Sequence, residues 1–348
     1  MTVVLRVHRI PAASVAIPHG TRIMKQNWLR LSIALFTFSL VQHPAVAQLY
    51  HFTDLGILPG KASSSATGIN SHGDIVGTAL SADIQSNAAF IWTAANGMQD
   101  LGQPTGGSIS STAAGINDAG QVVGYFEEAS GFYRAYMWTS ASGMQELGDK
   151  PGDTGHFNTA NAINNSGQVA GKANVVFLWT SGTGMQALSN PLGSSQAYAI
   201  SSDGRVGGST GLIGAIWNTD GTIEYLNPLA SDQNSFVTAI NSAGQVVGVS
   251  AGRDGSHAVI WNADGPKDLG TLQTNSDPSA VYYTYPYGMN NNGLVVGISV
   301  NDDAYRAFVW SATAGIQDLS NLMDNSGAGW TLEIAYSINE AGQIVGSA

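Results

Sequence analysis

Short runs of apolar residues alternate with polar turns along most of this chain, and one such pattern recurs seven times. In each copy, small and apolar residues lead to an Ile or Met, a turn containing Gly follows, and a short apolar run then ends in Gly. A period of 37 to 49 residues between successive copies is typical of one supersecondary unit repeated along a chain. The copies are centred on Ile69, Ile116, Ile163, Ile200, Ile240, Met289 and Ile338.

A single repeat, residues 112–148, predicts four short strands. TAAGIN and QVVGY flank a tight turn at 118–120, AYMW follows as a third apolar run, and MQELG forms a fourth after a second turn. Short runs bounded by Gly, Asn and Ser are typical of strands rather than helices. Gly at the last turn position can adopt the positive φ that a tight hairpin requires. Four antiparallel strands in each unit indicate a β-propeller blade.

The recurrent side chains predict how neighbouring blades pack. We expect a Trp in the third strand to stack each blade on the next, because its side chain offers a large apolar surface. We expect the small residue before each Ile or Met to suit a crowded inner strand near the axis. The third-strand residues are Trp92, Trp138, Trp179, Trp217, Trp261 and Trp310.

The ends of the repeat region predict how the ring closes. A fourth-strand phrase at 52–56 precedes the first repeat, and no third or fourth strand follows Gly346 in the seventh. An N-terminal strand that joins the last blade removes an open sheet edge. We therefore predict an all-β fold, a seven-bladed β-propeller of four-stranded antiparallel blades, with strand 52–56 closing an incomplete last blade. The same repeats leave an open β-solenoid as the alternative.

The first 47 residues have the features of a secretory signal peptide. Lys25 and Arg30 precede an apolar run at 31–41, and Ala45-Val46-Ala47 provides a small-x-small cleavage pattern. The run is too short to span a bilayer, so we expect no membrane span after cleavage. Met24 is an alternative start. These features divide the chain into a signal peptide at 1–47 and a single repeat domain at 48–348.

Charge and composition narrow the classes of partner. The formal net charge is −11, and without residues 1–47 it becomes −16, with 8 basic and 24 acidic residues. Such an acidic domain repels phosphate backbones, so we expect no nucleic-acid partner. The absence of Cys excludes disulfides, thiolate zinc sites and Cys nucleophiles. We expect a monomer that carries no cofactor.

The repeats resemble those of the HAF-repeat family of exported bacterial proteins, named after a His-Ala-Phe phrase in the third strand. The phrase recurs here as NAAFIW (87–92), RAYMW (134–138), HAVIW (257–261) and RAFVW (306–310), and only His257 keeps the His. The resemblance covers residues 52–346. It implies a bacterial protein that is secreted, periplasmic or held at the cell surface, and it supplies no catalytic residue to carry over.

Two variable loops contain candidate ligand-binding residues. The second-to-third and fourth-to-first connections vary in length and emerge on the same face of a propeller, where recognition is usual. Residues 277–287 contain four tyrosines, and residues 126–134 mix aromatic, acidic and basic side chains; Arg306 matches Arg134 in the third-strand phrase. The alternatives are a β-run with inter-blade tyrosines and a solvated hairpin tip. The candidates are Tyr282, Tyr283, Tyr285, Tyr287, Glu127, Glu128, Tyr133, Arg134 and Arg306.

Catalytic and metal-binding motifs are weak in this sequence. Asp302 and Asp303 could offer oxygen ligands, but they lack the alternating acids and closing Glu of an EF-hand, so we expect no metal site. The histidines have no metal-binding or triad spacing. We therefore expect a binding or surface-interaction module with a carbohydrate or protein ligand on the variable-loop face. The alternative is a hydrolase or lyase acting on extracellular polysaccharide through carboxylates on that face.

Overall fold

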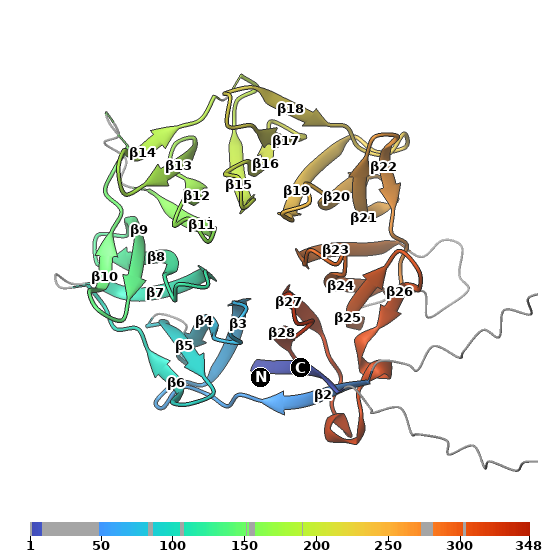
Figure 1. The fold of residues 1–348 in the computed structure, drawn as a ribbon, viewed down its shortest axis with the longest axis horizontal. Helices are drawn as coiled ribbons and strands as arrows, with labels where there is room; N and C mark the ends of the chain where they lie inside the picture. Colours follow the sequence, from blue (N-terminus) through green and yellow to red (C-terminus); the bar gives the residue numbers. More distant parts are fainter. Residues whose placement is uncertain are drawn as a thin grey trace, which may run out of the picture.

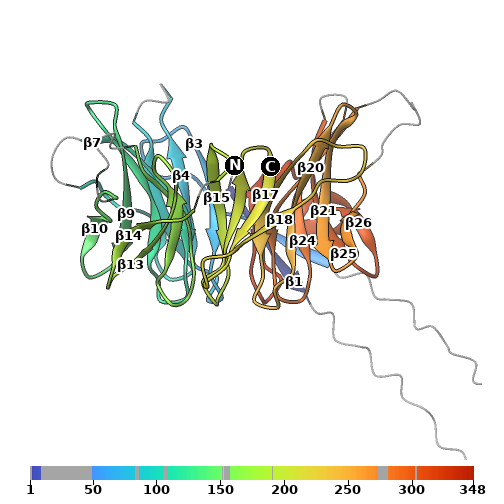
Figure 2. The same cartoon turned by 90° about the horizontal axis from the view of Figure 1, so that it is seen from above.

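Six of the seven repeats fold as meanders of four antiparallel strands, and all seven stand side by side around a central axis (Figure 1). The computed structural model describes residues 2–8, 49–82, 86–104, 108–150, 152, 157–189, 191–272, 281–301 and 304–348. Within these ranges the chain contains strands and two 3-10 helices but no α-helix. No helix among these residues has the length and hydrophobicity needed to cross a membrane. In the side view of Figure 2, the strands that can be made out run up and down between the two faces of the ring.

In each unit the strands follow chain order from the strand nearest the ring axis to the outermost strand. The exception is the unit that contains both termini. The first three units comprise β3 (Ser63–Ile69), β4 (Ile75–Leu80), β5 (Ala88–Thr93) and β6 (Gly97–Asp100); β7 (Ser108–Ile116), β8 (Val122–Glu128), β9 (Tyr133–Thr139) and β10 (Gly143–Glu146); and β11 (Thr159–Ile163), β12 (Val169–Lys172), β13 (Val176–Thr180) and β14 (Gly184–Ala187). The next three comprise β15 (Ser195–Ile200), β16 (Val206–Thr210), β17 (Ile213–Trp217) and β18 (Ile223–Leu226); β19 (Asn234–Ile240), β20 (Val246–Gly252), β21 (Gly255–Asn262) and β22 (Gly265–Asp268); and β23 (Tyr282–Met289), β24 (Val295–Asn301), β25 (Ala304–Ser311) and β26 (Gly315–Asp318).

The ring closes on itself through its inner strands. Each inner strand contacts the next, in the order β3, β7, β11, β15, β19, β23 and β27, and β27 contacts β3 again. The Asn339 amide in the last unit also donates a hydrogen bond of 2.9 Å to the Asn70 carbonyl oxygen in the first. An open β-solenoid would leave these two units far apart, so the alternative fold is wrong.

The prediction of seven separate blades is also wrong. The structure contains five separate four-stranded antiparallel blades, and the two remaining repeat units share one eight-stranded sheet, β19 to β26. The units merge because β21 lies parallel to β23, with Gly255 opposite Tyr282 and Ser256 opposite Tyr283. Gly255 permits this approach, since a Cβ atom there would overlap the Tyr282 carbonyl oxygen. The sequence repeat therefore does not show which units form separate blades and which pair with each other.

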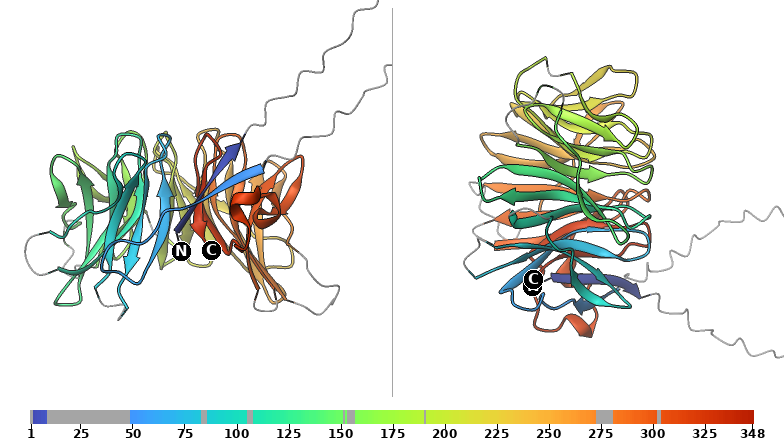
Figure 3. Two further views of the ribbon diagram at one scale, coloured as in Figure 1. Left: turned by 90° about the horizontal axis from the view of Figure 1, so that it is seen from below. Right: turned by 90° about the vertical axis from the view of Figure 1, so that its left-hand side faces the viewer.

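The last blade is complete, contrary to the prediction that it lacks a strand. Its order is β27 (Ile334–Ile338), β28 (Ile344–Ser347), β1 (Thr2–His8) and β2 (Leu49–Asp54), so both termini belong to one blade (Figure 3). The outer strand at 49–54 overlaps the segment expected to close the ring. Strand β1 comes from the segment expected to be a signal peptide, and it pairs with β28 and β2 on its two edges.

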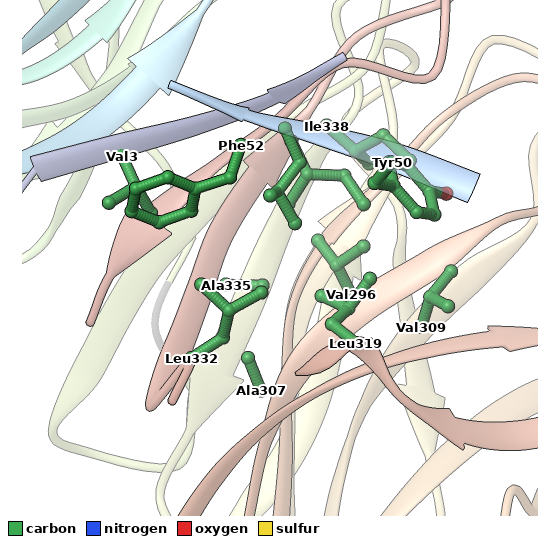
Figure 4. Packing of buried hydrophobic residues seen from close by; sticks show 12 residues of the cluster. Val3, Tyr50, Phe52, Val296, Ala307, Val309, Leu319, Leu332, Ala335 and Ile338 are labelled. Carbon is green, nitrogen blue, oxygen red and sulfur yellow. The ribbon is translucent and has the colours of Figure 1, made fainter. Parts of the chain in front are cut away.

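A hydrophobic cluster fixes the closing blade to its neighbour (Figure 4). Val3, Tyr50 and Phe52 from the N-terminal strands pack with Val296 and Val309 of the preceding unit, and Trp330 stacks on Phe52 with ring centroids 5.2 Å apart. Two short 3-10 helices, η1 (Leu319–Leu322) and η2 (Asn325–Gly327), connect β26 to β27 across this region. Burial of these side chains provides the main favourable free energy for closing the ring.

Asparagine side chains at one end of the inner strands link successive units around the ring. The side-chain amide of the Asn that follows the Ile or Met donates to the backbone carbonyl oxygen at the same position in the next unit, over 2.9 to 3.2 Å. Six of the seven links are present in the described structure, and the seventh position is Ser201. The donors are Asn70, Asn117, Asn164, Asn241, Asn290 and Asn339.

The same asparagines hold their own hairpin turns. The Oδ1 atom of Asn117 accepts hydrogen bonds from the backbone N–H groups of Ala119 and Gln121, at 3.1 and 3.0 Å. Its Nδ2 group also donates to Gln121 Oε1 at 2.7 Å. One buried carboxamide thus provides the hydrogen bonds of its own turn and the hydrogen bond to the next unit. We name the six asparagines that do so the asparagine ring.

The recurrent Trp connects neighbouring units at the outer strands, as the sequence predicted. Trp179, Trp217 and Trp261 donate their indole N–H to backbone carbonyl oxygens at the end of the preceding unit's fourth strand, over 2.7 to 3.1 Å. Trp217 and Trp261 are buried. The small residues before each Ile are crowded as expected: a Cβ atom on Gly288 would lie 3.1 Å from the Cα atom of Ser337.

We predict that Asn117→Ala lowers the free energy of unfolding by about 1–3 kcal/mol, because it removes the inter-unit hydrogen bond to the Asn164 carbonyl oxygen and the side-chain acceptor of the Ala119 and Gln121 N–H groups. Chemical denaturation followed by Trp fluorescence measures this change. The exposed Asn96 in a third-to-fourth-strand turn provides the control, since Asn96→Ala breaks no inter-unit link. Equal destabilisation by both substitutions would contradict a specific role for the asparagine ring.

We also predict a loss of stability at alkaline pH that depends on Tyr50. Burial raises the pKa of Tyr50 to about 12, whereas an unfolded Tyr ionises near pH 10. The contribution of Tyr50 is therefore complete below about pH 10 and is lost as the pH rises toward 12. In thermal unfolding, Tyr50→Phe should flatten the fall in Tm over this range. A variant with the wild-type pH slope would show that other groups control it.

Candidate functional site

A β-bulge interrupts every inner strand at the same place, two residues before the Ile or Met. In β3, for example, Ala66 pairs with Gly77 and Gly68 pairs with Val76, which leaves Thr67 between them without a partner across the strands. A bulge can re-aim a side chain, and bulges are frequent beside functional sites. The bulged residues are Thr67, Ala114, Asn161, Tyr198, Thr238, Tyr287 and Tyr336.

Six of these bulged residues line a cavity of about 220 Å³ between the inner strands. The remaining lining consists mainly of the neighbouring small residues and Ile side chains. The inner strands surround the ring axis in Figure 1, so this cavity lies in the central channel. The bulge therefore brings one variable position from each of these units to a shared site.

The cavity has two unlike sides. Consecutive strands β3, β7 and β11 contribute the short side chains of Thr67, Ala114 and Asn161, while β15, β23 and β27 contribute three tyrosines. Thr67 and Asn161 are held against the wall, because each donates a hydrogen bond of 2.8 Å to a carbonyl oxygen of the next inner strand. Space is thus left opposite the tyrosines, and we name Tyr198, Tyr287 and Tyr336 the channel tyrosines.

The channel tyrosines are accessible from solvent yet partly enclosed. Tyr198 is 43% exposed and Tyr287 is 38% exposed, and the rings of Tyr287 and Tyr336 lie 5.5 Å apart at a tilt of 35°. Burial raises the pKa of both Tyr198 and Tyr287, with Tyr336 and Tyr285 adding to the increase at Tyr287. Their phenol groups therefore stay protonated at neutral pH and can donate hydrogen bonds.

The residues that line this cavity include no carboxylate, imidazole or guanidinium group. The described part of the chain also contains no cluster of three or more His, Asp or Glu side chains that could hold a metal ion. The lining instead offers aromatic faces, hydroxyl groups and one carboxamide. Such groups bind an uncharged ligand through stacking and hydrogen bonds.

The structure separates the four predicted tyrosines of residues 277–287. All four lie on β23, and residues 277–280 are outside the described residues. Tyr287 faces the channel cavity, while Tyr285 donates its hydroxyl to Ser256 Oγ of the neighbouring unit at 3.2 Å. Tyr282 and Tyr283 lie at the start of the strand, beside β21. The segment is thus a β-run, as the alternative prediction had it, and only Tyr287 reaches the cavity.

The second predicted loop forms a hairpin in which the charged side chains are paired. Arg134 contacts Glu128 Oε1 at 2.9 Å and Asp149 Oδ2 at 3.0 Å, and Asp149 also accepts from Asn158 at 2.8 Å. Burial lowers the pKa of the Arg134 guanidinium, whereas the hydrogen bonds and charges of Glu128 and Asp149 raise it. The second effect is larger, so the pKa is raised overall. Arg134 therefore links the end of β8 and the segment that follows β10 to β9.

The remaining residues of this hairpin form its backbone pair and an aromatic contact. Glu127 pairs with Tyr133 across β8 and β9, and Tyr133 packs edge-on against Tyr125 and Phe157. The hairpin lies outside the channel, and its residues do not line the channel cavity.

The basic residue of the third-strand phrase pairs with an acid of the fourth strand. Arg306 Nη1 contacts Asp318 Oδ2 at 3.1 Å, and His257 Nδ1 lies 3.4 Å from Asp268 Oδ2. This pairing gives Arg306 a role within its own sheet, away from the channel cavity. Asp302 and Asp303, the weak metal candidates, lie outside the described residues.

Sequence reasoning missed Tyr198 and Tyr336. Both occupy the position two residues before Ile200 and Ile338, where the other units carry Thr, Ala, Asn or Tyr. That position is the variable one within an otherwise regular inner strand, and alignment of the seven repeats would have identified it. The predicted ligand-binding residues were placed in the variable loops instead, because the alternation of apolar and polar residues does not reveal a bulge.

Comparison with known proteins identifies the fold but no family. No protein-family model matches the chain, and no curated protein matches it. Streptogramin B lyase superposes with a TM-score of 0.54 at 11% identity, over 84% of this chain and 96% of that chain.

Virginiamycin B lyase from Staphylococcus aureus gives a TM-score of 0.51 at 11% identity, over 81% of this chain and 94% of that chain. The β-propeller domain of the Trilobed protease from Pyrococcus furiosus gives 0.48 at 12% identity, over 82% and 87%. At such low identities the similarity to the two lyases shows the fold alone, in agreement with the closed ring of blades seen in this chain.

Proposed function

We propose that this protein is a carbohydrate-binding module whose ligand enters the central channel and packs on the channel tyrosines. The observation that carries the proposal is the bulge position, which bears Tyr on one side of the channel and short side chains on the other. A sugar ring has an apolar face and several hydroxyl groups. The flat Tyr ring can stack on the apolar face of the sugar, and the phenol group can hydrogen-bond to its hydroxyl groups.

The size of the cavity favours a sugar over a protein ligand. A volume of about 220 Å³ is below the roughly 300–1,000 Å³ of pockets that enclose drug-sized ligands, so it accommodates about one ring with its substituents. A stable protein interface buries roughly 1,200–2,000 Å², which this channel cannot offer. The neutral lining and the formal net charge of −11 favour an uncharged sugar over a polyanion.

The channel gives the hydrolase or lyase alternative little support. Retaining and inverting glycosidases need two carboxyl groups on either side of the bond that breaks. The glutamates are dispersed: Glu127 and Glu128 lie in the β8–β9 hairpin, and Glu224 lies on the outer strand β18. None of them lines the channel cavity.

A glycan array followed by calorimetric titration tests the proposal. We expect a neutral glycan to bind, and Tyr287→Ala to weaken binding by about tenfold or more, because the substitution removes a stacking surface. Tyr287→Phe keeps the ring and should retain most of the affinity.

Tyr305→Ala provides the matched control. Tyr305 is 54% exposed on β25, outside the channel cavity, so its removal should leave affinity unchanged. Equal loss in the Tyr287→Ala and Tyr305→Ala variants would refute the channel as the binding site. Release of reducing sugar from the bound glycan would instead support the enzyme alternative.

Export from a bacterial cell and membership of the HAF-repeat proteins remain part of this proposal. The basic residues, apolar run and Ala45-Val46-Ala47 pattern support export. N-terminal sequencing of the protein recovered outside the cytoplasm should then begin near Gln48. Cleavage there would remove β1 and leave β28 and β2 without the strand between them. A recovered chain that still begins before residue 24 would contradict processing at this site.

A further inference from the structure

The unit from β15 to β18 departs from the repeat at two places that are far apart in sequence. At the first, Ser201 replaces the ring Asn, and Arg205 replaces the Gln found at this position in four other units. At the second, strand β18 carries Glu224-Tyr225 where the other fourth strands carry Gln, Lys or Thr followed by an acid or Ala. Both departures meet at one cavity of about 410 Å³ between this unit and the next.

The first of these differences, Ser201 in place of Asn, interrupts the asparagine ring. Ser201 Oγ accepts from the Arg205 backbone N–H at 2.9 Å and also contacts Asp203, so it serves its own turn. Its short side chain makes none of the described hydrogen bonds to Asn241 of the next unit. The interface between these two units therefore lacks the link that joins the others.

Arg205 occupies the inner end of the cavity. Its Nε donates to Asp203 Oδ2 at 3.1 Å, and Nη2 lies 3.1 Å from the place where a Cβ atom of Gly244 would be. The guanidinium thus reaches over the neighbouring turn instead of ending within its own unit. Its terminal N–H groups can donate hydrogen bonds to a ligand in the cavity, while the ion pair with Asp203 holds the guanidinium group in position.

The outer end of the cavity combines an acid with aromatic surfaces. Glu224 is exposed, Tyr225 is 43% exposed, and both line the cavity. Trp261 forms part of its buried wall, and the hydrogen bond from its indole N–H to the Asn227 carbonyl oxygen, 2.8 Å long, fixes the ring. Asn262 and Pro266 of the next unit complete this side.

We propose that this inter-blade cavity is a second carbohydrate site, which binds an uncharged sugar unit between Arg205, Glu224 and Tyr225. A hydroxyl group can accept from a guanidinium and donate to a carboxylate, and adjacent sugar hydroxyls can do both. The aromatic walls suit the apolar face of the ring. Arg205, Asp203 and Glu224 together carry one net negative charge, which disfavours an acidic sugar. This site shares no lining residue with the channel cavity.

The decisive variants replace the unusual residues of the β15–β18 unit with those found in the other units. Ser201→Asn with Arg205→Gln inserts the side chains that other units use at these positions, so the protein should fold with at least wild-type stability. Glu224→Gln likewise inserts the residue that most fourth strands carry. The matched control is Gln99→Ala on β6, at the position that corresponds to Glu224.

Saturation-transfer NMR and calorimetry with a panel of methyl glycosides measure binding by the full chain that carries Tyr287→Ala. This background separates the inter-blade site from the channel, so either proposal can fail alone. We expect at least one neutral methyl glycoside to bind, with affinity about tenfold or more lower in the restored double variant and in Glu224→Gln, and unchanged in Gln99→Ala.

Three results would overturn the second site. The first is that no glycoside of the panel binds in the Tyr287→Ala background. The second is binding that the restored double variant and Glu224→Gln leave intact. The third is binding of methyl glucuronide alone, strengthened by Glu224→Gln, which would show an anion site in place of a neutral sugar site.

Discussion

The asparagine ring is the interaction on which the remaining structure depends. A carboxamide has two donors and one acceptor atom with two lone pairs, and each ring Asn uses them on its own turn and on the next unit's carbonyl oxygen. Six of the seven hairpins are therefore linked to an Asn of the preceding unit, and the exception is the β19–β20 hairpin that follows Ser201. The bulge two residues before the Ile or Met is present in all seven units, including that one.

This arrangement separates the positions that hold the scaffold from those that can vary. The second-strand Gly, such as Gly248, cannot change without a clash with a first-strand carbonyl oxygen, and the small residue before the Ile faces the adjacent inner strand. The bulged residue meets neither constraint, because it lies between paired positions and projects into the channel. The seven units can therefore carry Thr, Ala, Asn or Tyr there without disturbing the blades.

The unit that contains Ser201 shows what happens where the ring is interrupted. Loss of the Asn removes one inter-unit link, and Arg205 and Tyr225 border the cavity of about 410 Å³ between this unit and the next. Hydrophobic burial at Trp261 and Trp217 still holds the units on both sides together. The scaffold thus tolerates one missing link because the outer Trp contacts supply an independent connection.

The sequence predicted the strand pattern, a closing outer strand at 52–56 that overlaps the observed strand at 49–54, and the roles of Trp and the small inner residues. These follow from local alternation, turn chemistry and side-chain size, which are present within each repeat. It did not predict the eight-stranded sheet, the placement of β1, or the pairing of Arg134 and Arg306 with acids. Each of these depends on the distance between segments that the chain does not connect directly.

What the sequence determined by itself is a repeated four-stranded unit with a fixed Asn-led turn, since hydrogen bonding and burial within a unit depend on near neighbours. Only the tertiary structure decided which residues meet in the channel. Tyr198, Tyr287 and Tyr336 are separated by 49 to 138 residues, and they come together because ring closure aligns the bulges of distant units. The proposed function on this scaffold therefore depends on a position that varies from repeat to repeat, and only the closed ring shows that these variable residues meet.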